Sequence, residues 1–340
     1  MNIDFVVTWV DGNDIEWQRE KAKYSGQEFG DDRIKRYRDW DLLRYWFRGI
    51  EKFAPWVNKI HFVTYGHLPS WLDTNNPKLH IVNHKDYIPE QYLPTFSCRP
   101  IELNIHRIPG LSEDFVYFND DMFLLSPVTQ EDFFKKGLPC DTAILQATYM
   151  HGEDANGEVL KPEDYNTSNI YNMPPLNRHF NKKQSIKSNY WKWFSPKYGT
   201  KWIRTLLLMP WGEFTGFMSP HLPYSYHKST FEEAWNKEEF LFDRACQHRF
   251  RDSTDISSRL LSFWQLAKGD FYPRSAKIGQ YFAICNDDAK NEKLNKTIRS
   301  GEYKILCIND EYTGDDFEGV KEQLINSFET VLPEKSSFEK

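Results

Sequence analysis

Two adjacent acidic residues interrupt an apolar stretch of the chain. In FVYFNDDMFLL, residues 115–125, Asn119, Asp120 and Asp121 separate two apolar runs. Carboxylates at the end of a buried strand are costly to remove from water. Ligands of open α/β sheets bind at such strand ends, where carboxylates can hold Mg²⁺ or Mn²⁺ beside a diphosphate. We therefore predict a metal site at Asp120 and Asp121; the alternative is a turn or helix cap formed by Asn119 or Asp120.

A third acidic residue follows another apolar run. Residues 3–10 are apolar and β-branched, and they end at Asp11 and Gly12, a turn signal. Gly12 would let the backbone approach a ligand closely. Asp11 could contact a nucleobase, a ribose or a metal. Strand–Asp–Gly turns are common, so this signal gains weight only together with the later acidic pair.

Two histidines flank the segment PYSY in SPHLPYSYHK. Either His221 or His227 could be a packed structural residue, or a general base towards a hydroxyl group. Spacing alone does not choose between them. The turn before His221 favours projection from a loop, whereas His227 directly precedes KSTFEE, a helix-start signal in which Ser229 or Thr230 would be the cap. We therefore predict that His221 is the base.

Two arginines surround one aromatic residue in HRFR, residues 248–251. If this segment is extended, Arg249 and Arg251 face the same side and could clamp phosphate oxygens; if it is helical, they do not. The alternative is a solvated pair of charges.

Further polar pairs come near other expected element ends. We expect Arg99 and Glu102 to lie near the strand ends that carry the acidic residues, where a nucleotide could bind. The alternative is a salt bridge between them at the start of a helix. Asn309 and Asp310 end the last expected strand, KILCIND. These four residues are candidates for binding the nucleotide-sugar.

Strands and helices alternate along the first part of the chain, which predicts an α/β fold with a mostly parallel sheet and flanking helices. Apolar runs predict strands and helical spacing predicts helices. The expected strands are residues 3–10, 59–64, 79–83, 115–118 and 303–308, and the expected helices are residues 39–53, 100–108, a stretch ending near 266, and 317–331.

The middle of the chain has a different composition. Residues 152–198 are rich in Asn, Lys, Pro and Tyr without sustained periodicity. We expect one catalytic domain over residues 1–340, in which residues 146–210 form a variable, irregular and partly helical insertion or lid.

Composition limits the partners. The net charge of −6 gives no basic field for nucleic acid, and the aromatic content of 16% suits sugar rings as well as a core. Five scattered cysteines form no metal-binding or disulfide pattern. No signal peptide and no stretch long enough to span a membrane is evident. We expect a cytoplasmic protein that could still associate with the inner face of the plasma membrane; its oligomeric state stays open.

Four separated segments together resemble the Stealth family, which includes capsular polysaccharide phosphotransferases and the N-acetylglucosamine-1-phosphotransferase of lysosomal enzymes. IDFVVTWVDGND resembles the first conserved block. DLLRYWFRGIEKFAPWVNKIHFVT and IELNIHRIPGLSEDFVYFNDDMFLL are similar to the second. HLPYSYHKSTFEEAW through HRFRDSTDIS resembles the third, and ILCINDEY the fourth.

The resemblance implies a glycosyltransferase-A-like fold and transfer of a hexose-1-phosphate from a UDP-sugar to a glycan hydroxyl, with UMP released. UDP-N-acetylhexosamine is one such donor, but the resemblance does not carry over the identity of the donor sugar or of the acceptor. The residues carried over from the matching motifs are Asp11, Asp120, Asp121, His221, Arg249, Arg251, Asn309 and Asp310.

Three other functions remain open. An ordinary metal-dependent glycosyltransferase would use the same pocket but release UDP. A non-catalytic binding protein would hold the donor without turnover. A phosphatase or nuclease would share the acids and the metal but need no sugar acceptor.

Overall fold

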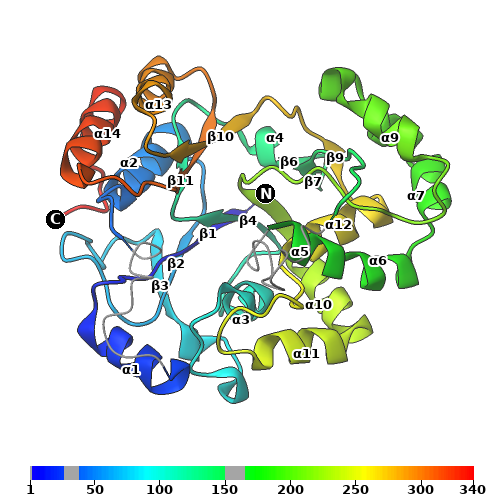
Figure 1. Cartoon of the computed structure of the whole chain (residues 1–340), viewed down its shortest axis with the longest axis horizontal. Helices are drawn as coiled ribbons and strands as arrows, with labels where there is room; N and C mark the ends of the chain where they lie inside the picture. Colours follow the sequence, from blue (N-terminus) through cyan, green and yellow to red (C-terminus); the bar gives the residue numbers. More distant parts are fainter. Residues whose placement is uncertain (1, 27–37, 150–164) are drawn as a thin grey trace, which may run out of the picture.

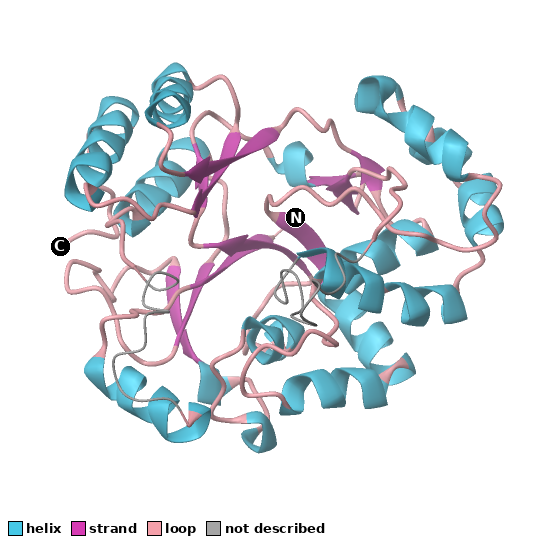
Figure 2. Ribbon diagram, in the orientation of Figure 1, coloured by secondary structure: helices cyan, strands magenta, loops and turns pink. Residues whose placement is uncertain are grey.

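The computed structural model describes residues 2–26, 38–149 and 165–340, and its central element is a five-stranded sheet (Figures 1 and 2). The strand order is β3-β2-β1-β4-β8. The first four of these strands are parallel, and β8 pairs antiparallel with β4. The strands are β1 (Ile3–Thr8), β2 (Ile60–Thr64), β3 (Leu79–Asn83), β4 (Asp114–Asn119) and β8 (Tyr224–His227).

Apolar side chains on both faces explain why these segments form the centre of the molecule. On β1, Phe5 and Val7 belong to one hydrophobic cluster and Val6 to the other. On β4, Phe118 and Phe115 divide in the same way. Because successive residues of a strand point to opposite faces, a strand buried on both faces is apolar over most of its length. The buried Asp4 of β1 is an exception, and its carboxylate is bonded to Asn58, His61 and the backbone N–H of Ser112.

Two smaller sheets flank the central one. The first has the order β10-β11-β5 and contains β5 (Met122–Leu124), β10 (Gly279–Ile284) and β11 (Ile305–Asp310). The second has the order β6-β7-β9 and contains β6 (Phe134–Lys135), β7 (Leu138–Asp141) and β9 (Tyr272–Pro273). The chain therefore leaves the central sheet between β4 and β5, at residues 119–121.

Helices cover both faces of the central sheet. One hydrophobic cluster includes residues of α2 (Leu43–Phe53), α13 (Asp288–Ser300) and α14 (Phe317–Val331), which lie together with β10 and β11 in Figure 1. The other includes residues of α3 (Cys98–Leu103), α10 (Lys228–Lys237), α11 (Glu239–Gln247) and α12 (Arg259–Lys268). Two further helices are α1 (Ile15–Ser25) and α4 (Gln130–Phe133).

Short helices make up the described part of the expected insertion at residues 146–210. They are α5 (Tyr165–Tyr171), α6 (Met173–His179), α7 (Lys182–Ser188), α8 (Tyr190–Trp193) and α9 (Trp202–Leu208). Residues 150–164 of the insertion lie outside the described residues. Whether the segment acts as a lid stays a prediction.

The α/β class with a mostly parallel sheet is confirmed. Over the described residues, no helix is both long enough and apolar enough to span a membrane.

Candidate active site

The acidic turn (residues 119–121) lies where two parallel strands of the central sheet end side by side. Thr8 of β1 pairs with Asn119 of β4, so the loop after β1 and the acidic turn share one edge of the sheet. The backbone oxygen of Asp121 accepts a hydrogen bond of 2.8 Å from the backbone N–H of Ile308 on β11. The turn is thus fixed between two sheets, at the carboxyl ends of β1 and β4.

The carboxylate of Asp121 is only partly satisfied. Its Oδ2 accepts a hydrogen bond of 3.4 Å from the Sγ of Cys307, and it lies 3.7 Å from the Nε2 of His221. Its Oδ1 is buried and has no hydrogen-bond partner among the described residues. Buried polar atoms almost always have a partner, so this oxygen is available to a ligand.

The Asp120 carboxyl group titrates unusually. The residue is exposed to solvent, yet desolvation by the surrounding protein, and then the charge of Asp121, raises its pKa to about 7. Two adjacent carboxylates repel each other, and a bound cation would remove that repulsion.

Asp39 extends the acidic region and was missed in the sequence analysis. Desolvation raises its pKa, and the charge of Asp11 acts in the same direction; the charge of Asp39 in turn raises the pKa of Asp120. Asp11, Asp39 and the acidic turn are therefore close enough to influence one another. The sequence signal was the run Asp-Trp-Asp before α2, which was used only to place the start of that helix.

His221 is held beside the acidic turn by an arginine. The Nη2 of Arg259 donates to its Nδ1 over 3.0 Å, and its Nε2 lies 3.2 Å from the Nδ2 of Asn119. An arginine can only donate, so Nδ1 carries the lone pair and the ring proton is on Nε2, which faces Asp121. Because an amide NH₂ group also only donates, this tautomer requires the Asn119 amide to turn its Oδ1 towards the ring N–H. In this arrangement neither ring nitrogen is ready to accept a proton. A base role for His221 requires that Arg259 first release Nδ1.

Arg259 was also missed in the sequence analysis. It begins α12, directly after the segment HRFRDSTDIS in which two other arginines drew attention.

The residues around the turn fit a divalent cation. Ligand atoms of Asp121, His221 and Cys307 all lie within 4.8 Å of one another. Burial, and then the charge of Asp121, raises the pKa of the Cys307 thiol, so the thiol stays protonated and donates to Asp121. Carboxylate oxygens and imidazole suit Mg²⁺ or Mn²⁺ better than a thiol does. Asp120 and Asp121 remain the predicted metal ligands.

His227 occupies a structural position. Its Nδ1 lies 2.8 Å from the Oδ1 of Asp114, and its ring packs on Phe134. His227 is also the N-cap residue of α10, but it makes no side-chain cap hydrogen bond. The expected cap at Ser229 or Thr230 is wrong, because α10 already begins at Lys228.

The two arginines of HRFR lie in a loop after α11, and the segment is neither a strand nor a helix. Both side chains are exposed. The guanidinium of Arg249 lies 4.6 Å from the ring centroid of Tyr24, and its backbone oxygen accepts from the backbone N–H of Phe96 over 2.8 Å. Between them, Phe250 stacks on Phe96.

Aromatic contacts place this arginine loop on the same side as the loop after β1. Phe96 contacts Tyr65, and Tyr65 contacts His67. The Nε2 of His67 accepts a hydrogen bond of 2.7 Å from the backbone N–H of Asp11. A phosphate-binding role for Arg249 and Arg251 stays a prediction.

Glu102 and Arg99 lie deeper than the sequence suggested. Glu102 is buried and accepts hydrogen bonds from the hydroxyl groups of Ser258, over 2.5 Å, and Tyr117, over 3.4 Å. Tyr117 in turn contacts Thr8 at the end of β1. Glu102 is thus connected through Tyr117 to the end of β1, and it helps to fix the position of that strand end. The Nη2 of Arg99 donates to Ser168, but its Nε is buried without a partner among the described residues.

The remaining candidates lie at the ends of β11 and β1. Asp310 forms a bidentate ion pair with Arg38 and also accepts from the indole N–H of Trp40. Any ligand contact of Asp310 would have to replace one of these bonds. Asn309 donates weakly to Glu311 over 3.5 Å. Gly12 is buried, and its carbonyl accepts from the side chain of Gln18.

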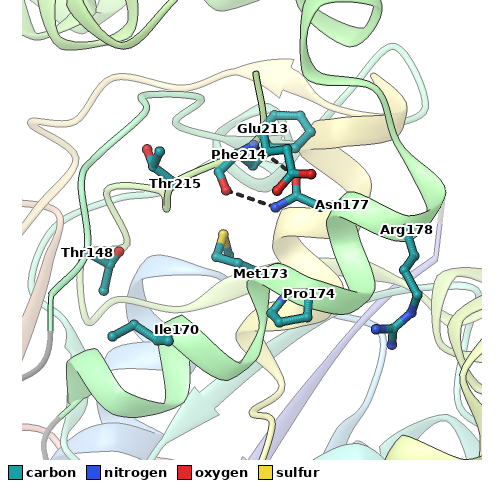
Figure 3. Close-up of a pocket in the computed structure, with 9 residues that line it drawn as sticks. All are labelled: Thr148, Ile170, Met173, Pro174, Asn177, Arg178, Glu213, Phe214 and Thr215. Carbon is teal, nitrogen blue, oxygen red and sulfur yellow. Dashed lines mark hydrogen bonds between the residues drawn. The ribbon is translucent and has the colours of Figure 1, made fainter. Parts of the chain in front are cut away.

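A separate cavity of about 570 Å³ opens between α6 and residues 213–215 (Figure 3). Its floor is fixed by Asn177, whose side chain exchanges two hydrogen bonds with the backbone of Phe214. Both polar and apolar side chains line it: Thr148, Ile170, Met173, Pro174, Asn177, Arg178, Glu213, Phe214 and Thr215. This mixed lining suits a polar ligand with apolar faces, such as a sugar.

These features define an α/β protein with an acidic site at the carboxyl ends of parallel strands, and the comparisons with known proteins identify its family. Residues 1–28 match Stealth protein CR1, conserved region 1, and residues 36–140 match Stealth protein CR2, conserved region 2. The chain is 43% identical over 343 residues to the capsular polysaccharide phosphotransferase WcwK of Streptococcus pneumoniae, covering 99% of this chain and 98% of that protein. The chain belongs to the Stealth family.

Other full-length relatives carry similar names. The chain is 43% identical over 345 residues to the receptor polysaccharide phosphotransferase WefC of Streptococcus oralis, covering 99% of both. It is 38% identical over 341 residues to the exopolysaccharide phosphotransferase cps2G of Lactiplantibacillus plantarum, covering 100% of this chain and 96% of that protein.

Solved structures are much more distant. The galactosyltransferase LgtC in complex with donor and acceptor sugar analogs shares 9% identity, with 96% of each chain covered and a TM-score of 0.37. Mouse xyloside xylosyltransferase 1 shares 11% identity, covering 90% of this chain and 97% of that one, with a TM-score of 0.34. Likenesses of this size say nothing about what the chain transfers.

Proposed function

We propose that the protein is an enzyme of capsular or cell-surface polysaccharide synthesis that transfers a sugar phosphate. The observation that carries the proposal is the identity of 43% to a capsular polysaccharide phosphotransferase across 99% of the chain. The donor would be a UDP-sugar, with an N-acetylhexosamine as the first to test. The hydroxyl oxygen of a glycan acceptor would attack the phosphorus attached to the sugar, and the bond to the second phosphate would break, releasing UMP.

Asp120 and Asp121 would hold a Mg²⁺ or Mn²⁺ ion. When bound, such an ion neutralises charge that develops on the diphosphate as the leaving group departs. The buried, unpartnered Oδ1 of Asp121 and the raised pKa of Asp120 support this assignment. Asp11 and Asp39 add negative charge around the site, and His67 fixes the backbone of Asp11.

His221 would take the proton of the acceptor hydroxyl. In the structure its Nδ1 accepts from Arg259. A bound diphosphate is an anionic acceptor and competes for the guanidinium better than a neutral imidazole does. We expect Arg259 to turn towards the donor phosphates, which leaves His221 able to accept a proton.

The cavity of Figure 3 would receive part of the acceptor glycan. Thr215 lines it, residues 215–218 pair with residues 144–148, and the chain then runs through Ser219 and Pro220 to His221. Five residues lie between Thr215 and His221, so the chain makes six Cα–Cα steps and the cavity lies within about 20 Å of the imidazole. An oligosaccharide of a few rings can span that distance.

The transfer of phosphate can be tested directly. The protein is incubated with a glycan primer and UDP-N-acetylglucosamine carrying a radioactive phosphorus next to the sugar. A sugar-phosphate transferase moves the label into the glycan and releases UMP. An ordinary glycosyltransferase leaves the label in released UDP, and that result would overturn the proposal. A panel of other UDP-sugars covers the choice of donor.

A further inference from the structure

The insertion helices carry a concentration of positive charge that the rest of the chain lacks. Residues 165–212 contain eight Lys and Arg residues and no Asp or Glu, whereas the whole chain has a net charge of −6. The basic residues are Arg178, Lys182, Lys183, Lys187, Lys192, Lys197, Lys201 and Arg204. Such a local excess creates a positive field on an otherwise acidic protein.

Four of these residues point their charge into solvent. They are exposed, and none forms an ion pair with a carboxylate among the described residues: Lys183, Lys187, Lys201 and Arg204. By contrast, Lys182 and Lys192 are buried and donate to the backbone oxygens of Leu208 and Gly269. The buried lysines hold the insertion together, so the exposed ones need another explanation.

The outward face of α9 is apolar, which is the reverse of an ordinary surface helix. Ile203, Leu206 and Leu207 lie one helical turn apart and are 42%, 52% and 67% exposed. The inward face is fixed by Thr205, whose hydroxyl accepts from the backbone N–H of Leu145. The orientation of the helix is therefore set by the core, and its apolar side is left in water.

Exposed aromatic residues lie next to this helix. Tyr190 and Trp191 of α8 and Trp211 after α9 are each more than half exposed. Tyr190 contacts Phe194, and Phe194 contacts Trp202 of α9, so the exposed ring of Tyr190 is continuous with α9. We call the exposed apolar residues of α8, α9 and Trp211, with the four exposed basic residues, the basic–aromatic surface. In Figure 1, α7 and α9 lie at the outer edge of the molecule, away from the central sheet.

We propose that the basic–aromatic surface docks on a lipid bilayer that carries anionic headgroups. Tyr and Trp side chains favour the boundary between headgroups and hydrocarbon, and Leu and Ile side chains favour the hydrocarbon just below it. Lysines and arginines around them bind anionic lipid, each contributing about fivefold in affinity. A second copy of the chain would bring like charges together, so the charge of this surface favours lipid over self-association.

This inference does not rest on the proposed reaction, because binding is measured without substrate. The full chain is mixed with vesicles of phosphatidylglycerol and phosphatidylcholine, or of phosphatidylcholine alone, and bound protein is separated by sedimentation. We expect binding to the anionic vesicles at low ionic strength, weaker binding as salt is added, and much weaker binding to neutral vesicles.

Two variants separate the contributions. The apolar variant carries Leu206→Glu and Leu207→Glu, and the charge variant carries Lys183→Gln, Lys187→Gln, Lys201→Gln and Arg204→Gln. The charge variant should lose about two orders of magnitude or more in affinity. The apolar variant should lose binding at every salt concentration. Phe240→Glu, at a residue of α11 that is 78% exposed, is the matched control and should bind like the parent protein.

Unchanged circular dichroism and melting temperature show that each variant is folded, since all the altered side chains are exposed. Failure of the parent protein to bind anionic vesicles, or equal binding by the parent and both variants, would overturn the proposal. A parent dimer that the apolar variant dissociates, without any vesicle binding, would assign the surface to self-association instead.

Discussion

At the scale of single residues, the sequence predicted which acids meet but not what holds them. The acidic turn was found because two carboxylates interrupt an apolar run, and β1 and β4 do end together. The neighbours of Asp121 are distant in the chain: Cys307 comes from β11 and His221 from the loop before β8. Contacts between residues so far apart in the sequence depend on which strands and sheets lie side by side. The spacing of residues within one segment does not reveal this.

Asp121 is the residue whose change should most directly test the metal assignment. Asp121→Asn keeps the size of the side chain but removes its charge, so we expect activity to fall by about a thousandfold or more. Mn²⁺ binding, measured by electron paramagnetic resonance without substrate, should weaken in parallel. Glu131→Gln, at an exposed surface acid, should leave both unchanged. Full activity of the Asn variant in the presence of a chelator would contradict the assignment.

The two histidines provide a matched pair for the proton transfer. His221→Ala should lower kcat by about two to four orders of magnitude, the usual contribution of a general base. Donor affinity should not fall, because a base contacts the acceptor hydroxyl and the loss of the imidazole leaves Arg259 free for the diphosphate. His227→Ala should lower the melting temperature instead, since it breaks the contact with Asp114. If His227→Ala alone lowers kcat, the base has been assigned to the wrong imidazole; if His221→Ala abolishes donor binding, the residue belongs to the phosphate site.

At the scale of elements, apolar periodicity placed the central strands well. The third predicted strand has the bounds of β3, and the second differs from β2 by one residue. Boundaries that depend on tertiary contacts were less accurate: α2 begins at Leu43 although residues from 39 onwards were expected to be helical. Residues 38–41 are held instead by the bonds of Arg38 and Trp40 to Asp310, which no local pattern reveals.

The 3₁₀ turn Ile105–Arg107, which follows α3 and packs on α10, should make stability depend on pH. His106 is buried against Phe231 and Trp235, and its Nδ1 has no hydrogen-bond partner among the described residues. Burial lowers its pKa to about 3. An unfolded chain binds a proton here near pH 6.5, whereas the folded protein does not until pH 3, so stability falls as the pH decreases between these values.

Replacing the imidazole should remove part of this dependence. We expect His106→Phe, which keeps an aromatic ring in the site, to lose less stability than the parent between pH 6.5 and about 4. The difference should approach about 1.4 kcal/mol per pH unit, measured by urea unfolding at several pH values. Some dependence should remain, because burial also lowers the pKa of His84, to about 4. Equal slopes for the two proteins would show that His106 does not titrate on unfolding.

At the scale of the whole molecule, the last residues of the chain complete the first hydrophobic cluster. Phe338 packs on Phe47 of α2, and the backbone of Glu339 forms an isolated antiparallel β-bridge with that of Leu72. The sequence predicted α14 but gave no sign that the residues after it are part of the core. The reason is that their partners lie almost the full length of the chain away.

Arg48 of α2 binds the residues after α14, and we expect its ion pair with Glu339 to contribute strongly to the free energy of unfolding. The guanidinium donates two hydrogen bonds, of 2.8 and 2.9 Å, to Glu339, and a third to the backbone oxygen of Leu332. The side chains of Arg48 and Glu339 are only 6% and 3% exposed. Arg48→Met leaves the carboxylate of Glu339 buried without its partner, so we expect a loss of about 3–5 kcal/mol in the free energy of unfolding.

A double variant separates the ion pair from simple packing. If the loss in Arg48→Met comes from the uncompensated charge of Glu339, then Arg48→Met combined with Glu339→Leu should recover most of it, because two apolar side chains replace the pair. Both variants are measured by urea unfolding at neutral pH, together with the single variant Glu339→Leu. A loss of less than about 1 kcal/mol in Arg48→Met would be typical of a surface pair and would contradict the expected role. Equal losses in the single and double variants would mean that the arginine acts by filling space and by binding Leu332, with the charge of Glu339 contributing little.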